Sequence, residues 1–124
     1  MLEIVENFSS EGYEDILNSH GGKPVHITEA LERGKKTGFI AYSYGAERAY
    51  ILALDDGGDL MLCDGLVRSV MFKASLKGMN CIEFELSDEG MYENIRKLKF
   101  LTGDSRICGN IGRFMNGCAD CKHK

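Results

Sequence analysis

The sequence predicts an α/β (α+β) fold, with a mixed, mostly antiparallel central sheet flanked by helices. Two strand-like runs, 38–44 and 48–54, are joined by a short glycine-containing loop, which indicates a hairpin. A loop, an amphipathic helix over 62–77 and a strand over 81–86 follow. A strand, a helix and a strand in this order form a crossover between parallel strands, so the fourth and fifth strands are expected to run parallel.

The segments before the hairpin are predicted to supply a strand and a helix. Residues 2–7 can form a short strand, and a helix is expected to follow from about Ser9 to the adjacent glycines at its end. The apolar face of this helix would comprise Tyr13, Ile16 and Leu17. The segment 25–31 has the spacing of an extended stretch, although 28–33 could equally be helical.

The helix over 62–77 is predicted to have an unusually broad buried face, and Gly78 ends it. The residues of that face are Leu62, Leu66, Val67, Val70, Met71 and Ala74. The strand over 81–86 alternates apolar and polar residues and so has one buried face. A further helix is expected to start near Ser87, with Met91, Ile95 and Leu98 on one side.

The tail from Thr102 is rich in glycine, and its apolar residues recur at near-helical spacing. These residues are Ile107, Ile111, Phe114 and Met115. We therefore expect one domain over 1–101, followed by a cysteine-containing C-terminal extension over 102–124 that packs on this domain or trails from it.

The composition is that of a folded domain without a nucleic-acid or membrane partner. The chain has 124 residues, a net charge of −4, 44% hydrophobic and 27% charged residues, which excludes a disordered or collagen-like chain. Nucleic-acid binding would need a clustered surplus of lysine and arginine, which this charge balance argues against. The longest apolar run, 49–54, is far shorter than the roughly 20 residues that span a bilayer.

The N-terminus shows no basic segment followed by an apolar stretch, so it does not resemble a signal peptide. The chain has five cysteines in no regular framework, which favours thiols in a reducing compartment over a disulfide scaffold. We therefore expect a cytoplasmic protein. Its strand edges are compatible with a monomer or a homodimer.

The order of the elements resembles that of the GNAT superfamily of N-acetyltransferases. The stretches that carry the resemblance are 29–42, 49–54, 64–78, 81–86 and 91–101. The last of them ends in Arg96-Lys-Leu-Lys-Phe100, which is similar to the end of the family's closing helix. The pair Cys118 and Cys121 is similar to the Cys-x-x-Cys near the C-terminus of small clostridial-type GNAT-like proteins.

The resemblance implies acetyl-CoA as cosubstrate, held between a fourth and a fifth strand that diverge. The pantetheine arm would pair with exposed backbone groups, and the pyrophosphate would lie on N–H groups at the start of the following helix. The cofactor-binding residues implied are Ala53, Leu54, Asp55, Gly57, Gly58, Asp59, Leu60, Met61, Leu62 and Cys63. The implied function is binding of acetyl-CoA or another acyl-CoA and acyl transfer to a small-molecule amine or a peptide.

Two features, the phosphate loop and the tyrosine that acts as general acid, depart from the pattern of the family. Its phosphate loop, Arg/Gln-x-x-Gly-x-Gly/Ala, aligns here with Gly58-Asp-Leu-Met-Leu-Cys63. Asp59 and Asp64 would place negative charge beside a pyrophosphate unless a cation or Arg68 compensates. These departures favour an alternative, a catalytically degenerate module for ligand sensing or protein interaction.

Acyl transfer needs a general base for the amine and a proton donor for the leaving thiolate. The family's tyrosine acid aligns with Ile95, and Tyr92 lies one helical turn earlier as the nearest candidate acid. Acidic residues on or beside the central strands are Glu47, Asp55, Glu83 and Glu85, and we single out Glu83 with Tyr92. The alternative is that each carboxylate is a solvated surface residue and that Tyr92 belongs to the edge of the core.

A second alternative is a metal or thiol module. Cys108, Cys118, Cys121 and His123 could together form a tetrahedral zinc site. Cys118 and Cys121 could instead form a redox pair, or the tail could be inert. The aspartates in 55–59 could bind a divalent cation, but they lack the ligand spacing and terminal glutamate of a calcium loop, which favours a solvated turn or the degenerate cofactor loop described above.

Overall fold

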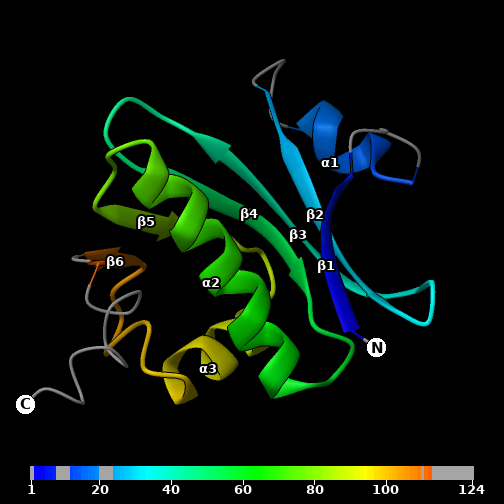
Figure 1. Ribbon diagram of the computed structural model, residues 1–124. Helices are drawn as coiled ribbons and strands as arrows, with labels where there is room; N and C mark the ends of the chain where they lie inside the picture. Colours follow the sequence, from blue (N-terminus) through cyan, green and yellow to red (C-terminus); the bar gives the residue numbers. More distant parts are fainter. Residues whose placement is uncertain (1, 8–11, 20–23, 110, 113–124) are drawn as a thin grey trace, which may run out of the picture.

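In the computed structural model, a sheet of six strands carries helices on both faces (Figure 1). The structure describes residues 2–7, 12–19, 24–109 and 111–112. The strands, in their order across the sheet, are β1 (Leu2–Asn7), β2 (His26–Glu32), β3 (Lys35–Tyr44), β4 (Ala49–Asp55), β5 (Cys81–Phe84) and β6 (Ile107–Gly109). Only β4 and β5 pair in parallel among these strands, so the predicted fold class is confirmed.

The helices of the described residues are α1 (Glu14–Ser19), α2 (Leu60–Leu76) and α3 (Glu89–Lys97). An aspartate caps the start of each of the longer two: Asp59 accepts hydrogen bonds from N–H groups of α2, and Asp88 accepts one from α3. No helix in the described part of the chain is long and apolar enough to cross a bilayer.

The sheet separates two apolar clusters. Ile40 and Tyr42 of β3 face the main core together with α2 and α3, whereas Ala41 faces a smaller cluster with Tyr13. This alternation is the period of two that a strand imposes on its side chains. The main core therefore lies between the sheet and the face that α2 and α3 cover, and α1 covers the other face (Figure 1).

In three segments the structure corrects a prediction made from the sequence or decides between two of them. Within the segment 25–33, His26–Glu32 form a strand, because β1 and β3 pair with its two edges. The near-helical spacing that begins at Ile107 does not correspond to a helix at its start, because Ile107–Gly109 form β6, which pairs with the outer edge of β5. The fifth strand ends at Phe84 rather than at Leu86.

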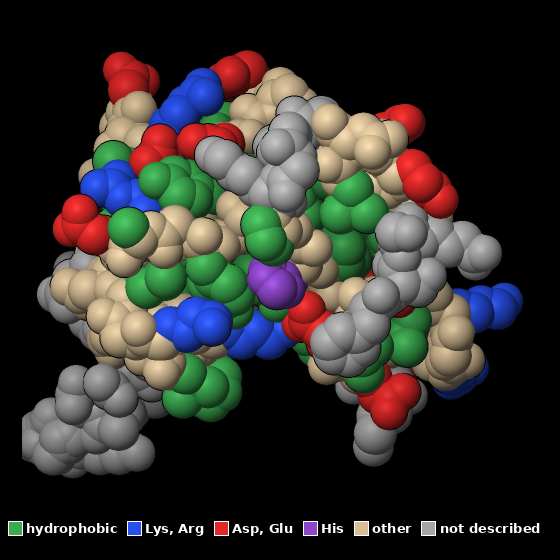
Figure 2. All heavy atoms as spheres, turned by 90° about the horizontal axis from the view of Figure 1, so that it is seen from above, with side chains coloured by type: hydrophobic (Ala, Val, Ile, Leu, Met, Phe, Trp, Pro, Cys, Tyr) green, Lys and Arg blue, Asp and Glu red, His purple; other side chains and the backbone are tan. Residues whose placement is uncertain are grey.

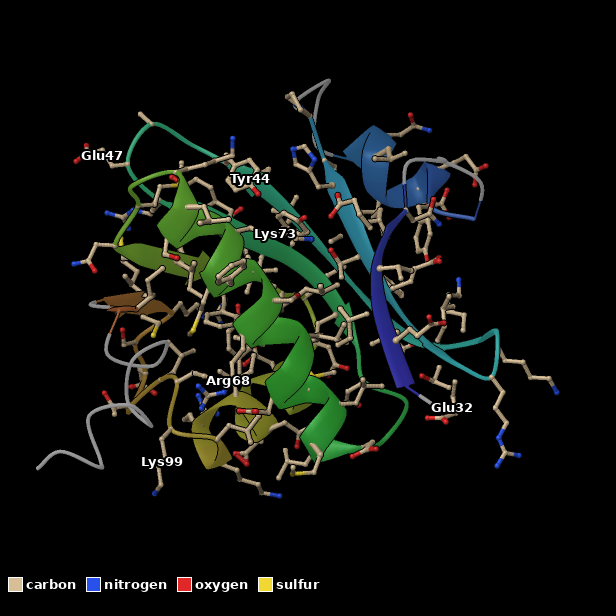
Figure 3. The ribbon with its side chains drawn as sticks, in the orientation of Figure 1. Glu32, Tyr44, Glu47, Arg68, Lys73 and Lys99 are labelled. Atoms are coloured by element: carbon tan, nitrogen blue, oxygen red, sulfur yellow. The ribbon has the colours of Figure 1, made fainter. Side chains whose placement is uncertain are left out.

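A polar cluster fixes α2 to the N-terminal strands. The Nζ of Lys73 donates hydrogen bonds to the Glu6 carboxylate, to Thr28 Oγ1 at 2.8 Å and to the Tyr42 hydroxyl at 3.0 Å. Burial alone would raise the pKa of Glu6, but the hydrogen bonds from Lys73, Tyr42 and Thr28 and the charge of Lys73 outweigh it and lower that pKa. Lys73 is labelled in Figure 3 where α2 crosses the sheet.

Truncating a core residue of α2 should cost far more stability than truncating an exposed residue of the same helix. Leu66 is fully buried in the main core, and Leu76 is 71% exposed. Leu66→Ala should therefore lower the free energy of unfolding by about 2–5 kcal/mol, and Leu76→Ala by no more than about 0.5 kcal/mol. Urea denaturation followed by circular dichroism measures both, and equal losses would contradict the placement of α2.

The Glu6 cluster should make stability depend on pH. Because folding lowers the pKa of Glu6 from 4.5, its contribution is present above pH 4.5 and is lost as the pH falls through the folded-state pKa. Glu6→Gln should lower the free energy of unfolding at pH 7 by about 1–2 kcal/mol, and this loss should become smaller as the pH falls below 4.5. Glu3→Gln, at an exposed position of the same strand, is the control and should change neither value.

Candidate functional site

The pairing of β4 with β5 ends halfway along β4. Their partners are Ala49 with Ile82, Tyr50 with Glu83 and Ile51 with Phe84, and the last bond runs from Glu85 N to Ile51 O at 2.8 Å. From Leu52 to Asp55, β4 continues without a partner among the described residues of β5. β5 ends at Phe84, and the chain that follows it diverges from β4, with a cavity between residues 52–54 and 86–88.

A β-bulge in β4 lies next to the point where the two segments diverge. Against β3, Ala41 pairs with Ala53 and Tyr42 pairs with Ile51, so Leu52 is an additional residue in β4. A bulge bends its strand and increases the local twist. The register of β4 against β3 therefore shifts by one residue at Leu52, next to the last residue of β4 that pairs with β5.

The diverging strands enclose a cavity of about 110 Å³. Its lining residues are Leu52, Ala53, Leu54, Leu86, Ser87, Asp88 and Met91. Ala53 and Leu54 were proposed from the sequence, whereas the residues of the opposite wall were missed. That wall depends on where β5 ends and α3 begins, and the one local signal for it was the Ser87-Asp88 helix start directly after a strand.

Tyr92 holds the end of β5 in place. Its side chain is 1% exposed, and its hydroxyl donates a hydrogen bond to Phe84 O at 3.0 Å and accepts one from Leu86 N at 2.9 Å. The hydroxyl thus satisfies backbone groups at the end of β5 and directly after it. To act as a proton donor to a ligand, it would first have to release Phe84 O.

Glu83 lies on the face of β5 opposite Ile82 and Phe84, and its carboxylate accepts a hydrogen bond from Arg48 Nη1 at 3.1 Å. The described residues that line the cavity include neither Glu83 nor Tyr92. Glu47 lies in the turn between β3 and β4, at the opposite end of β4 from the cavity (Figure 3). Glu85 is exposed, directly after β5.

The loop before α2 binds its own backbone N–H groups. Asp55 Oδ1 accepts from Gly57 N, and Asp56 Oδ1 accepts from Gly58 N, each at 2.9 Å. Asp56 is 5% exposed, and its Oδ2 also accepts from Asn94 Nδ2 of α3 at 3.2 Å. These carboxylates therefore satisfy the glycine N–H groups and attach the loop to α3.

The backbone N–H groups of the first turn of α2 also donate hydrogen bonds to an aspartate of the chain itself. Asp59 Oδ1 accepts from Met61 N at 2.9 Å and from Leu62 N at 3.4 Å, and its backbone oxygen accepts from Cys63 N. A pyrophosphate would need these N–H groups, which are ordinarily open at a helix start. The loop and the helix start therefore do not fit the pyrophosphate of CoA.

Arg68 does not supply the compensating charge. Its Nε lies 3.0 Å from both carboxylate oxygens of Asp64, one helical turn earlier, and its guanidinium lies over the ring of Phe100 (Figure 3). The positive charge of Arg68 is thereby directed at Asp64.

Cys63, at the end of the implied phosphate loop, belongs to the core. It is fully buried, and burial together with the carboxylates of Asp56 and Asp64 raises the pKa of its thiol to about 12. Its thiol therefore stays protonated at neutral pH and is not a nucleophile.

The proposed zinc ligands lie only partly within the described residues. Cys108 of β6 is 3% exposed and faces the main core. Cys118, Cys121 and His123 lie outside the described residues, so the zinc site and the redox pair stay predictions. In the part of the chain that the structure describes, no three metal-ligating side chains are grouped.

A second hollow of about 270 Å³ lies at the other end of β4. It is lined by Pro24, Ser43, Tyr44, Gly45 and Tyr50. Figure 2 looks onto this end of the molecule, where hydrophobic side chains are exposed among charged ones. The Nζ of Lys77 lies 4.6 Å from the centre of the Tyr44 ring, and burial is the main cause that raises the pKa of Tyr44 to about 12.

Comparison with known proteins gives a match at the level of structure alone. No family model matches the chain, and no curated protein matches it. The ribosomal-protein-alanine N-acetyltransferase of Brucella melitensis biovar Abortus 2308 superposes with a TM-score of 0.62 at 11% identity, over 84% of this chain and 94% of that one.

Two further solved structures agree with it. The ribosomal-protein-S18-alanine N-acetyltransferase of Escherichia coli has a TM-score of 0.62 at 13% identity, over 89% of this chain and 94% of its own. A GNAT family acetyltransferase of Elizabethkingia anophelis, with acetyl-CoA bound, has a TM-score of 0.59 at 14% identity, over 83% of this chain and 78% of its own. The chain therefore has the fold of the GNAT N-acetyltransferases.

Proposed function

We propose that the chain binds an acyl thioester such as acetyl-CoA in the gap between β4 and β5 and transfers the acyl group to an amine. The observation that carries this proposal is the divergence of the two strands after Ile51, with a cavity between them. The structural neighbours support it, because they are N-acetyltransferases and one of them holds acetyl-CoA.

The gap suits a narrow, extended ligand with amide groups. Backbone groups of a strand that lack a partner can pair with an added extended chain. The cavity of about 110 Å³ is much smaller than the roughly 300–1,000 Å³ of a site for a compact drug-sized ligand. Leu52, Leu86 and Met91 give it apolar walls, which would keep water away from a bound thioester.

In the proposed reaction, a neutral amine attacks the thioester carbonyl, the C–S bond breaks, and the amine proton is lost as the thiolate takes one up. The exposed Glu85 and Asp88 lie on the β5 side of the gap and would attract a cationic amine. Asp88 also caps α3 through Gly90 N. The main contribution of the protein would then be to hold thioester and amine together.

The second candidate is a module that binds a ligand in the same gap without turning it over. The Tyr92 hydroxyl, which is already engaged with Phe84 and Leu86, favours it. The two candidates differ in one measurable respect, because only the first predicts release of free thiol when an amine is added.

A bulky side chain in the gap should weaken the binding of acetyl-CoA. Ser87 is exposed and lines the cavity, so Ser87→Trp should block the gap without disturbing the core. In isothermal titration, we expect it to weaken acetyl-CoA binding by at least about tenfold. Ser75→Trp, at an exposed position of α2, is the control and should bind like the wild type. Absence of binding by the wild type at millimolar acetyl-CoA would overturn the proposal.

Tyr92→Phe should distinguish a positioning role from proton donation. Loss of the hydroxyl leaves the Leu86 N–H and Phe84 C=O unsatisfied, which should cost about 1–3 kcal/mol of stability. If Tyr92 only positions β5, the affinity for acetyl-CoA falls and kcat is kept; if it donates a proton, kcat falls at unchanged affinity. Tyr50→Phe, on β4, controls for the loss of a tyrosine hydroxyl.

A further inference from the structure

We propose that the donor is recognised through its pantetheine arm alone, so that the nucleotide end of CoA adds no affinity. The inference rests on the proposed function and concerns the same gap. The ligand class is a pantetheine thioester, whether free, attached to a nucleotide or attached to a larger carrier.

The N–H groups that would bind phosphate are engaged. Asp55 and Asp56 accept from Gly57 and Gly58, and Asp59 accepts from the first turn of α2. A carboxylate and a phosphate compete for the same donors, because both are anionic acceptors. An incoming pyrophosphate would have to displace carboxylates that are covalently part of the loop.

The local charge opposes a second anion. Residues 55–67 contain Asp55, Asp56, Asp59 and Asp64 and neither lysine nor arginine. Arg68, the next basic residue, already binds Asp64. Repulsion between charges acts over about 10 Å at 0.1 M salt, so a pyrophosphate at this helix start would be repelled by several carboxylates at once.

The loop is also fixed in position. Asp56 is buried and accepts a hydrogen bond from the half-buried Asn94 of α3, so it cannot turn away without losing this bond. Gly57 has φ +62° and packs so closely that an added Cβ would lie 2.6 Å from Thr37 O. Met61, which aligns with a glycine of the family's phosphate loop, is 77% exposed at the helix surface.

The gap itself is separate from these contacts. Its walls are residues 52–54 of β4 and 86–88 and Met91 on the other side, and none of the loop carboxylates described above lines it. An uncharged pantetheine arm could therefore enter the gap while the phosphate end stays in solvent.

The test compares three ligands on the full chain by isothermal titration: acetyl-CoA, S-acetyl-pantetheine and adenosine 3′,5′-bisphosphate. We expect equal affinity for the first two within about threefold, and no binding of the third. Raising the salt from 20 to 500 mM, values chosen to span about 20 Å to a few Å of screening, should strengthen acetyl-CoA binding and leave S-acetyl-pantetheine unaffected.

Charge removal provides an independent test. Asp59→Asn keeps a good helix cap and should tighten acetyl-CoA binding by about threefold without changing S-acetyl-pantetheine binding. Asp104→Asn, at an exposed position outside this loop, is the control and should change neither affinity.

The outcomes separate the two proposals. If acetyl-CoA binds more than about tenfold tighter than S-acetyl-pantetheine, or if the bisphosphate binds, this inference is overturned and the proposed function stands. If neither thioester binds, both are overturned. Equal binding of the two thioesters supports both.

Discussion

Leu52 is the extra residue of the bulge in β4 and has no partner opposite it in β3. The pairing of β4 with β5 stops at the residue before it. The bulge shifts the register of β4 against β3 by one residue and bends the strand at the point where its pairing with β5 stops. On the other side, the buried Tyr92 hydroxyl binds the backbone where β5 ends. The two walls of the gap are therefore set by a backbone irregularity in one strand and by a helix that fixes the other.

The backbone N–H groups at the start of α2 find their acceptors within the chain. The N-terminal N–H groups of a helix need acceptors, which can come from a ligand or from the chain itself. Here Asp55, Asp56 and Asp59 provide them. Farther along, Lys73 binds Glu6 and fixes α2 to the sheet. The position of α2 is thus stabilised by internal ion pairs and caps and requires no bound anion.

The order and type of most elements could be predicted because their signals are local. The broad stripe of α2, the hairpin of β3 and β4 and the start of α3 at Asp88 each lie within a few residues. The segment 25–33 could not be decided in this way, because its apolar spacing fits a helix and a strand alike and its two sheet neighbours decide. The three residues of β6 are too few to show a period.

The sequence by itself determined the fold class through its periodicity and glycine positions, whereas the expectation that Ala53 and Leu54 lie at a gap came from the resemblance to the GNAT superfamily. Only the tertiary structure decided which residues face them, since Leu86 and Met91 reach the gap through the end of β5 and the packing of α3. The aspartates before α2 were visible as charge. Their engagement with backbone N–H groups was not, because hydrogen-bond geometry depends on how the loop folds against β3 and α3.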